Sequence, residues 1–213
     1  MKQKNNITEV VFILDRSGSM AGLESDTIGG YNSLLKKQLE LEGEVRVTTI
    51  LFDDRYEVLH QRQLLHLIQP MTSNQYFVRG TTALLDAMGI AISNMIEQND
   101  YTNVAYRADK ILFVITTDGL ENASKQYSYD QIKKLIDQQK EQQGWEFIFL
   151  GANIDASKEA SKLGIDKERA VTYCNDSEGV TQNYEAISEA ISEMRMDHSI
   201  SSEWKTKVKK VKN

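Results

Sequence analysis

The chain has 213 residues, of which 40% are hydrophobic and 26% charged, a composition typical of a globular protein with a sizeable core. Its formal net charge of −6 argues against a general nucleic-acid-binding protein, because such proteins carry a positive surface. A single cysteine, Cys174, excludes an internal disulfide and is typical of a reducing cytoplasm, where we expect the protein. No apolar run approaches the roughly 18 residues of a membrane span, so we expect no membrane association.

In the first half of the chain, short apolar runs alternate with segments of helical periodicity. Residues 9–15 ("EVVFILD") predict a strand buried on both faces, and residues 23–41 predict a helix. Two glycines in this helix either weaken its first turn or allow close packing on a neighbour. A second strand over 44–54 is followed by the polar, alternating run 55–63, which indicates an edge strand paired with it in a hairpin. In the helix predicted over 23–41, the buried face is expected to carry Ile28, Tyr31, Leu35 and Leu39.

The second half repeats the alternation. A helix over 81–98 precedes the most hydrophobic run, 110–119, which is therefore predicted to be a central strand. The next helix is predicted to begin with a capping box of Ser128 and Gln131 and to end at Gly144. Further strands are predicted over 145–153 and 169–173, with helices over 155–164 and 177–196. The two long helices have predicted core faces of Leu84, Met88, Ile92 and Met95, and of Val180, Tyr184, Ile187, Ile191 and Met194.

Strands that alternate with helices in this way predict an α/β fold, in which a mostly parallel sheet has helices on both faces. We expect a single domain over residues 1–200, followed by a lysine-rich C-terminal tail over 201–213. The last nine residues, "KTKVKKVKN", carry five lysines and no acid. This segment is either a solvated chain end or a basic docking segment.

Polar residues gather in three loops that follow predicted strands, "DRSGSM" (15–20), "RGTTALLDA" (79–87) and "TTDGLENA" (116–123). Ligands of open α/β sheets bind outside the carboxyl ends of the strands, so these loops are candidates for one site. The candidate oxygen donors are Asp15, Ser17, Ser19, Thr81 or Thr82, and Asp118.

Two carboxylates and several hydroxyls are hard oxygen ligands, and this set suits Mg²⁺, or Mn²⁺ in its place. A calcium loop would be expected to carry more acidic residues. Several of these loop residues also have a simpler structural explanation. Asp15 could cap a turn, and either threonine could cap a helix. Asp86, in the first turn of the helix that follows, suits the helix dipole. Asp53 and Asp54 could likewise be only turn residues.

The segments "FILDRSGSM", "RGTTALLDA" and "FVITTDGLEN" resemble the three parts of the metal-ion-dependent adhesion site (MIDAS) of the von Willebrand factor A (vWA) domain family. The resemblance implies a Rossmann-like three-layer α/β/α fold with one antiparallel edge strand. Family members often read "GGTALYDA", and this alignment selects Thr82, with Thr81 as the alternative. By position, the metal shell implied by the resemblance is Asp15, Ser17, Ser19, Thr82 and Asp118. The partner-contact candidates that it implies are Arg16, Met20, Glu121 and Asn122, for which solvated loop residues are the alternative.

The resemblance implies a binding module rather than an enzyme, an adaptor or scaffold whose metal captures an Asp or Glu of a protein partner. The chain resembles small stand-alone intracellular vWA proteins, and from this resemblance we expect a bacterial or phage origin. The alternative is a Mg²⁺-dependent phosphohydrolase or phosphotransferase of the haloacid-dehalogenase type, which also begins with a hydrophobic strand ending in aspartate. That family needs a second aspartate two residues later, where this chain has Ser17.

Overall fold

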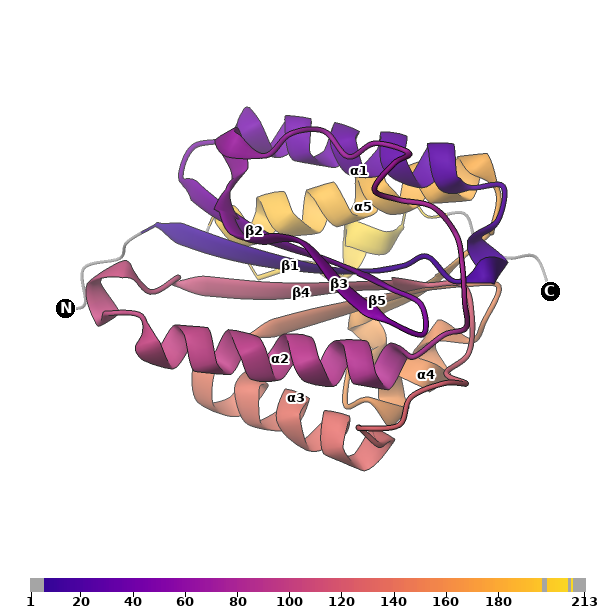
Figure 1. Ribbon diagram of the computed structural model, residues 1–213. Coiled ribbons are helices and arrows are strands. Elements are labelled where there is room, and N and C mark those ends of the chain that lie inside the picture. Colours follow the sequence, from indigo (N-terminus) through magenta and orange to yellow (C-terminus); the bar gives the residue numbers. More distant parts are fainter. Residues whose placement is uncertain (1–5, 197–198, 207, 209–213) are drawn as a thin grey trace.

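The computed structural model describes residues 6–196, 199–206 and 208, which form one six-stranded sheet with helices on both faces (Figure 1). The strands are β1 (Ile7–Asp15), β2 (Glu44–Phe52), β3 (Tyr56–Leu64), β4 (Lys110–Thr117), β5 (Glu146–Ala152) and β6 (Ala170–Tyr173). The helices are α1 (Glu24–Leu39), α2 (Leu84–Tyr101), α3 (Tyr129–Gln143), α4 (Ala156–Lys162) and α5 (Ser177–Arg195), with short 3-10 turns between elements. Within this part of the chain, no helix is both long and apolar enough to cross a membrane.

The strand order is β3-β2-β1-β4-β5-β6, and every neighbouring pair is parallel except β2 with β3. This confirms the predicted three-layer α/β/α fold with one antiparallel edge strand, and it confirms the central position of the 110–119 strand. The chain leaves β1 toward β2 and β3 and then returns through α2 to β4 on the other side of β1. The order of the strands therefore reverses between β1 and β4, the place where sheets of this type bind ligands.

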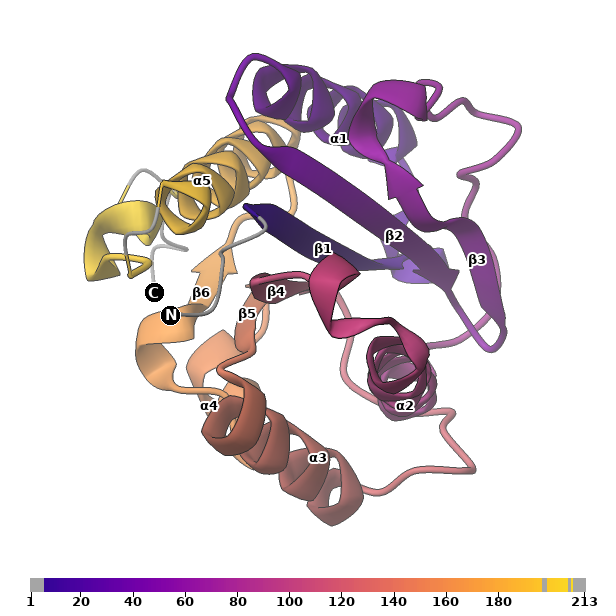
Figure 2. The same ribbon diagram turned by 90° about the vertical axis from the view of Figure 1, so that its left-hand side faces the viewer.

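Two hydrophobic clusters separate the layers, as Figures 1 and 2 show: α1 and α5 cover one face of the sheet, and α2, α3 and α4 cover the other. Strand β1 contributes to both clusters in alternation, with Val10, Phe12 and Leu14 on the first face and Val11 and Ile13 on the second. This alternation is the reason for its continuous apolar run, because a central parallel strand must be hydrophobic on both sides.

Helices α1 and α5 pack closely because α1 carries a glycine where the two meet. A Cβ atom on Gly30 would overlap the ring of Tyr184, so the close-packing explanation holds at this position. The prediction that Leu39 belongs to the buried face of this helix is wrong, since its side chain is 51% exposed. Gln38 is buried instead, and its Nε2 donates to the Ser188 carbonyl oxygen at 3.0 Å. Hydrophobic spacing cannot anticipate a polar side chain whose burial depends on a partner 150 residues away.

The other two predicted core faces are confirmed, since all their members are buried, and so is the capping box that begins α3. Gly144 ends α3 with a φ of 67°. Arg195, at the end of α5, joins this helix to the end of α1: its Nη2 donates to the Leu41 and Glu42 carbonyl oxygens, both at 2.9 Å.

The C-terminal segment packs on the domain as far as the structure describes it. Trp204 is 1% exposed, its Nε1 donates to the Glu168 carbonyl oxygen at 3.1 Å, and Val208 is also buried. Lys205 Nζ donates to the Lys167 carbonyl oxygen at 2.7 Å. The expectation of a solvated end therefore does not hold for this part of the predicted tail. The rest of it, residues 207 and 209–213, lies outside the described residues, and the domain boundary at 201 stays a prediction.

Candidate metal site

The three candidate loops meet at the reversal point of the sheet. Asp15 ends β1, and Asp118 follows the adjacent strand β4, where Leu14 pairs with Thr116. The loop over 79–87 joins the first loop through a hydrogen bond from the Gly18 N–H to the Gly80 carbonyl oxygen (3.2 Å). Parallel strands end at the same edge, so residues more than 100 positions apart face one another here.

Four of the predicted oxygen donors lie close together. The Ser17 and Ser19 hydroxyl oxygens are 3.1 Å apart, and the Ser19 hydroxyl donates to Asp118 Oδ1 at 2.5 Å. A Cβ atom built on Gly119 would lie 3.1 Å from Thr82 Oγ1 and 3.6 Å from Ser19 Oγ, so the Thr82 hydroxyl lies at the same place. Thr82 is buried at 3% exposure, whereas Thr81 is exposed. The structure therefore brings Thr82 rather than Thr81 to the other donors.

Asp15 is almost fully buried beneath this group, at 1% exposure. Its carboxylate accepts hydrogen bonds from the Ser17 N–H (2.7 Å) and the Thr117 hydroxyl (2.6 Å). Burial outweighs these bonds and raises the pKa of Asp15 to about 6. Burial also raises the pKa of Asp118 above its usual value. Both carboxylates are thus in surroundings that disfavour their charge unless a cation lies near them.

The donor set fits a hard divalent cation. It consists of two carboxylates and three hydroxyls, so all its ligands are oxygen atoms. Among the described residues, no group of three or more His, Cys, Asp or Glu side chains offers another metal site. Oxygen-only sites of this kind suit Mg²⁺ or Mn²⁺, whereas zinc sites usually include nitrogen or sulfur. The assignment of the five residues as metal ligands stays a prediction.

Arg16 lies inside the "DRSGS" loop but does not reach the surface. Its side chain is fully buried, its Nε donates to Asp53 Oδ2 at 3.0 Å, and its Nη2 donates to Glu57 Oε2 at 2.6 Å. The guanidinium carbon also lies 5.6 Å from the centroid of the Phe77 ring. The charge of Arg16 pairs with the β2–β3 hairpin, and the assignment of Arg16 as a partner-contact residue stays a prediction.

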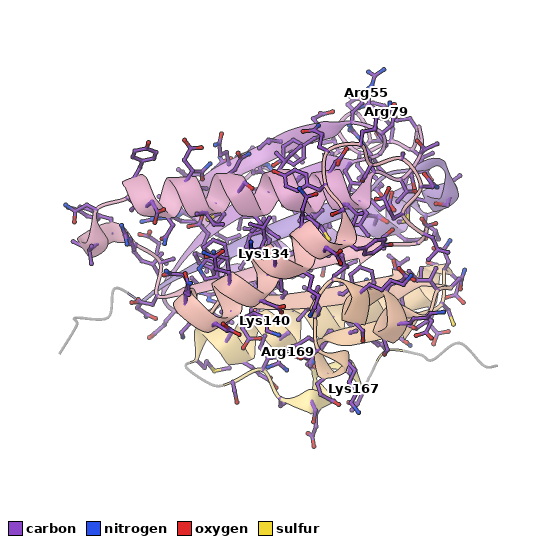
Figure 3. The ribbon with its side chains drawn as sticks, turned by 90° about the horizontal axis from the view of Figure 1, so that it is seen from below. Arg55, Arg79, Lys134, Lys140, Lys167 and Arg169 are labelled. Carbon is purple, nitrogen blue, oxygen red and sulfur yellow. The ribbon has the colours of Figure 1, made fainter. Side chains whose placement is uncertain are left out.

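Asp53 is the centre of this ion network and more than a turn residue. Arg79 Nε donates to the same Oδ2 oxygen at 2.6 Å, and the Arg55 N–H donates to Oδ1 at 2.8 Å. Burial acts to raise the pKa of Asp53, but the hydrogen bonds from Arg79 and Arg55 and the charges of the two paired arginines lower it overall. Figure 3 shows Arg55 and Arg79 beside each other at this end of the molecule. The network ties the first metal loop to the hairpin and to the loop before α2.

The other three partner-contact candidates are Met20, Glu121 and Asn122, and each has a place within the fold. Met20 is 4% exposed, and its assignment as a contact residue stays a prediction. The Glu121 carboxylate is held within its own loop and accepts from the Leu85 N–H at 2.9 Å at the start of α2. Asn122 is exposed, and its Oδ1 accepts from the Thr82 N–H at 3.0 Å, which positions the threonine.

Asp86, explained from sequence by the helix dipole, accepts backbone hydrogen bonds from three residues, Lys125, Gln126 and Tyr127.

Sequence reasoning missed three residues that support the site. Thr117 holds Asp15, the Tyr76 hydroxyl donates to the Asp15 carbonyl oxygen (2.5 Å), and Asn175 Nδ2 donates to Asp118 Oδ2 (3.4 Å). Thr117 could have been found, because it directly precedes Asp118 at the end of a buried strand. Tyr76 and Asn175 lie outside the three motif segments and carry no local signal.

Comparison with solved structures finds similar folds. Proximal thread matrix protein 1 from the mussel byssus, solved with a zinc-occupied MIDAS motif, is 11% identical with a TM-score of 0.61, over 88% of this chain and 48% of that one. The vWF domain of the type V pili tip protein Mfa5 from Porphyromonas gingivalis is 12% identical with a TM-score of 0.59, over 87% of this chain and 95% of that one. The chain thus spans about half the length of the mussel protein. At these identities the likeness shows the fold alone.

Comparison with protein families gives a match over residues 9–186 to the von Willebrand factor type A domain. No curated protein sequence matches the chain. The family match covers most of the chain and includes all three metal loops. The chain therefore belongs to the von Willebrand factor type A domain family.

Proposed function

We propose that this protein is a metal-dependent protein-binding module, an adaptor or scaffold that captures an acidic residue of its partner. Its metal would be Mg²⁺ or Mn²⁺, held by Asp15, Ser17, Ser19, Thr82 and Asp118. The observation that carries the proposal is the convergence of these oxygen donors at the reversal point of the sheet.

The charges of the donor set favour capture of a carboxylate. Two aspartates balance the charge of a divalent cation, and the neutral hydroxyls add oxygen without adding charge. Because no third carboxylate makes the site negative, a bound cation with an open coordination position would still accept an outside carboxylate, and Mg²⁺ commonly retains positions for such ligands. The bound metal supplies this attraction, while the protein supplies a rigid and largely buried oxygen cluster. The vWA domain commonly mediates protein–protein interaction, which agrees with the proposal.

Partner capture tests the proposal with a pair of adjacent threonines. We expect the purified protein to retain specific proteins from a native lysate in Mg²⁺ and to lose them in EDTA. Thr82→Val removes only the buried hydroxyl and should abolish retention, whereas Thr81→Val changes an exposed side chain and should not. Retention of the same proteins in EDTA, or by Thr82→Val, would contradict metal-dependent capture.

The raised pKa of Asp15 predicts a pH dependence of metal binding. Because the carboxyl in the metal-free protein titrates at about pH 6, a cation must displace a proton below that pH. We expect Mg²⁺ affinity to fall about tenfold between pH 7 and pH 5, as measured by isothermal titration calorimetry. Equal affinity at the two pH values would show that Asp15 is already ionised at pH 5.

In the metal-free protein, a rise in pH lowers stability, whereas it raises the affinity for Mg²⁺. The folded-state pKa of Asp15 lies above the ordinary value of 3.8, so the folded protein holds more protons than the unfolded chain between about pH 4 and pH 6. The contribution of this group to the free energy of unfolding is therefore present at low pH and lost as the pH rises through this window. In EDTA, the melting temperature of Asp15→Asn should therefore fall less than that of wild type between about pH 4 and pH 6.

A further inference from the structure

We propose that Asn175 is a further residue of the metal site, contributed by a fourth loop between β6 and α5. The inference rests on the proposed metal-binding function and extends it beyond the three motif loops. Asn175 would act in two ways, by holding Asp118 and by accepting a hydrogen bond from a water molecule of the cation's hydration shell.

The first role follows from the contacts of Asp118. One carboxylate oxygen, Oδ1, accepts from Ser19, and the other, Oδ2, accepts from Asn175 Nδ2 at 3.4 Å. The carboxylate is thus held on one side by a motif residue and on the other by Asn175. If Ser19 turns its oxygen to a cation, its hydroxyl remains beside the site, but the orientation of Asp118 then depends more on the amide of Asn175.

The second role follows from the other end of the same amide. Asn175 Oδ1 is buried and accepts no hydrogen bond from any of the described residues. A buried carbonyl oxygen without a donor is unfavourable, so buried oxygens are nearly always paired, often with ordered water. Because Nδ2 and Oδ1 belong to one planar amide, the unpaired oxygen is carried by the same group that contacts Asp118 through Nδ2. Mg²⁺ usually keeps several waters in protein sites, and these are donors of the kind that Oδ1 lacks.

The position of Asn175 is fixed by the ends of two other elements. Its backbone N–H donates to Asn153 Oδ1 at 3.3 Å, directly after β5. The next residue, Asp176, caps α5 by accepting from the Gly179 N–H at 2.7 Å. The loop is therefore anchored at Asn175 itself and at the next residue, as required of a residue that orients another side chain.

Three variants test the inference by calorimetric titration with Mg²⁺. Asn175→Ala removes both hydrogen-bonding groups and should weaken Mg²⁺ binding about tenfold, the lower end of the effect of residues that orient metal ligands. Asn175→Asp keeps the size but exchanges the Nδ2 donor for a second negative charge beside Asp118; it should bind Mg²⁺ more tightly than wild type, because attraction of the cation to the added charge outweighs the lost hydrogen bond. Asn103→Asp makes the same change of charge in an exposed turn at the other end of the sheet and should leave the affinity unchanged.

The outcomes separate this inference from the proposed function. If wild type binds Mg²⁺ and Asn175→Ala binds it equally well, the role of Asn175 is overturned and the metal site stands. A lower melting temperature of Asn175→Ala in EDTA with unchanged Mg²⁺ affinity would also overturn it, because the residue would then be only structural. If wild type binds neither Mg²⁺ nor Mn²⁺, the proposed function itself fails.

Discussion

Replacing Asp15 is expected to abolish the rise in melting temperature that Mg²⁺ gives to the wild-type protein. A ligand at about 100 times its dissociation constant stabilises the native state by about 2.7 kcal/mol. For a domain of this size, each kcal/mol raises the melting temperature by about 2–4 °C, so the wild-type shift should be about 5–10 °C. Asp15 lies at the bottom of the oxygen cluster and supplies one of its two negative charges. Without that charge, Asp118 alone cannot balance a divalent cation.

Two variants keep this test clear of misfolding. Asp15→Ala removes the group that accepts from Ser17 and Thr117, and it therefore lowers stability whether or not metal is present. Asp15→Asn has nearly the same shape, keeps an acceptor oxygen and carries no buried charge, so its melting temperature in EDTA at neutral pH should equal or exceed that of wild type. Differential scanning fluorimetry in Mg²⁺ and in EDTA gives both values. A Mg²⁺ shift in Asp15→Asn as large as that of wild type would contradict the assignment of Asp15 to the metal shell.

Replacing Asp53 by asparagine is expected to lower the free energy of unfolding by about 3 kcal/mol. Breaking a buried ion pair from one side typically costs about 3–5 kcal/mol, because it leaves an uncompensated charge in the interior. Arg16 and Asp53 are both fully buried, and Arg79 donates to the same carboxylate. The value falls at the lower end because Glu57, whose side chain is 48% exposed, still pairs with Arg16. Urea denaturation at pH 7 measures the difference.

The neighbouring carboxylate provides the control. Asp54 is adjacent in sequence but exposed, so Asp54→Asn should change the free energy of unfolding by less than about 0.5 kcal/mol. The lowered pKa of Asp53 means that its contribution is present above about pH 4, where the unfolded carboxyl is ionised, and is lost as the pH falls through its folded-state pKa. A loss below about 1 kcal/mol in Asp53→Asn would show that the loop opens and water reaches the Arg16 guanidinium.

Much of the fold could be predicted from the sequence because its signals are local. The "EVVFILD" and "KILFVITT" runs identify central parallel strands, since only such strands are apolar on both faces. The capping box at Ser128 and the Gly144 stop fix the ends of α3 by chemistry within one helical turn. The three metal loops were found for a similar reason, because each directly follows a strand or opens a helix.

Side-chain burial could not be predicted in the same way. Arg16 and Gln38 are polar, and sequence patterns place such residues at the surface. Both are buried because partners distant in sequence, Asp53 and Ser188, satisfy their hydrogen bonds. Leu39 shows the converse, because it has the spacing of a core residue but lies at the end of α1 beyond the contact with α5.

The sequence by itself determined the class of fold, the three loops and the chemical nature of their oxygen donors, since all of these depend on residues close together in the chain. Only the tertiary structure decided which threonine reaches the site, that Arg16 belongs to a buried ion network, and that Thr117, Tyr76 and Asn175 surround the two aspartates. These contacts join segments about 35 to 100 residues apart, and they exist because parallel strands end at one edge of the sheet. A loop after the sixth strand can therefore meet an aspartate after the fourth, although nothing local in either segment indicates it.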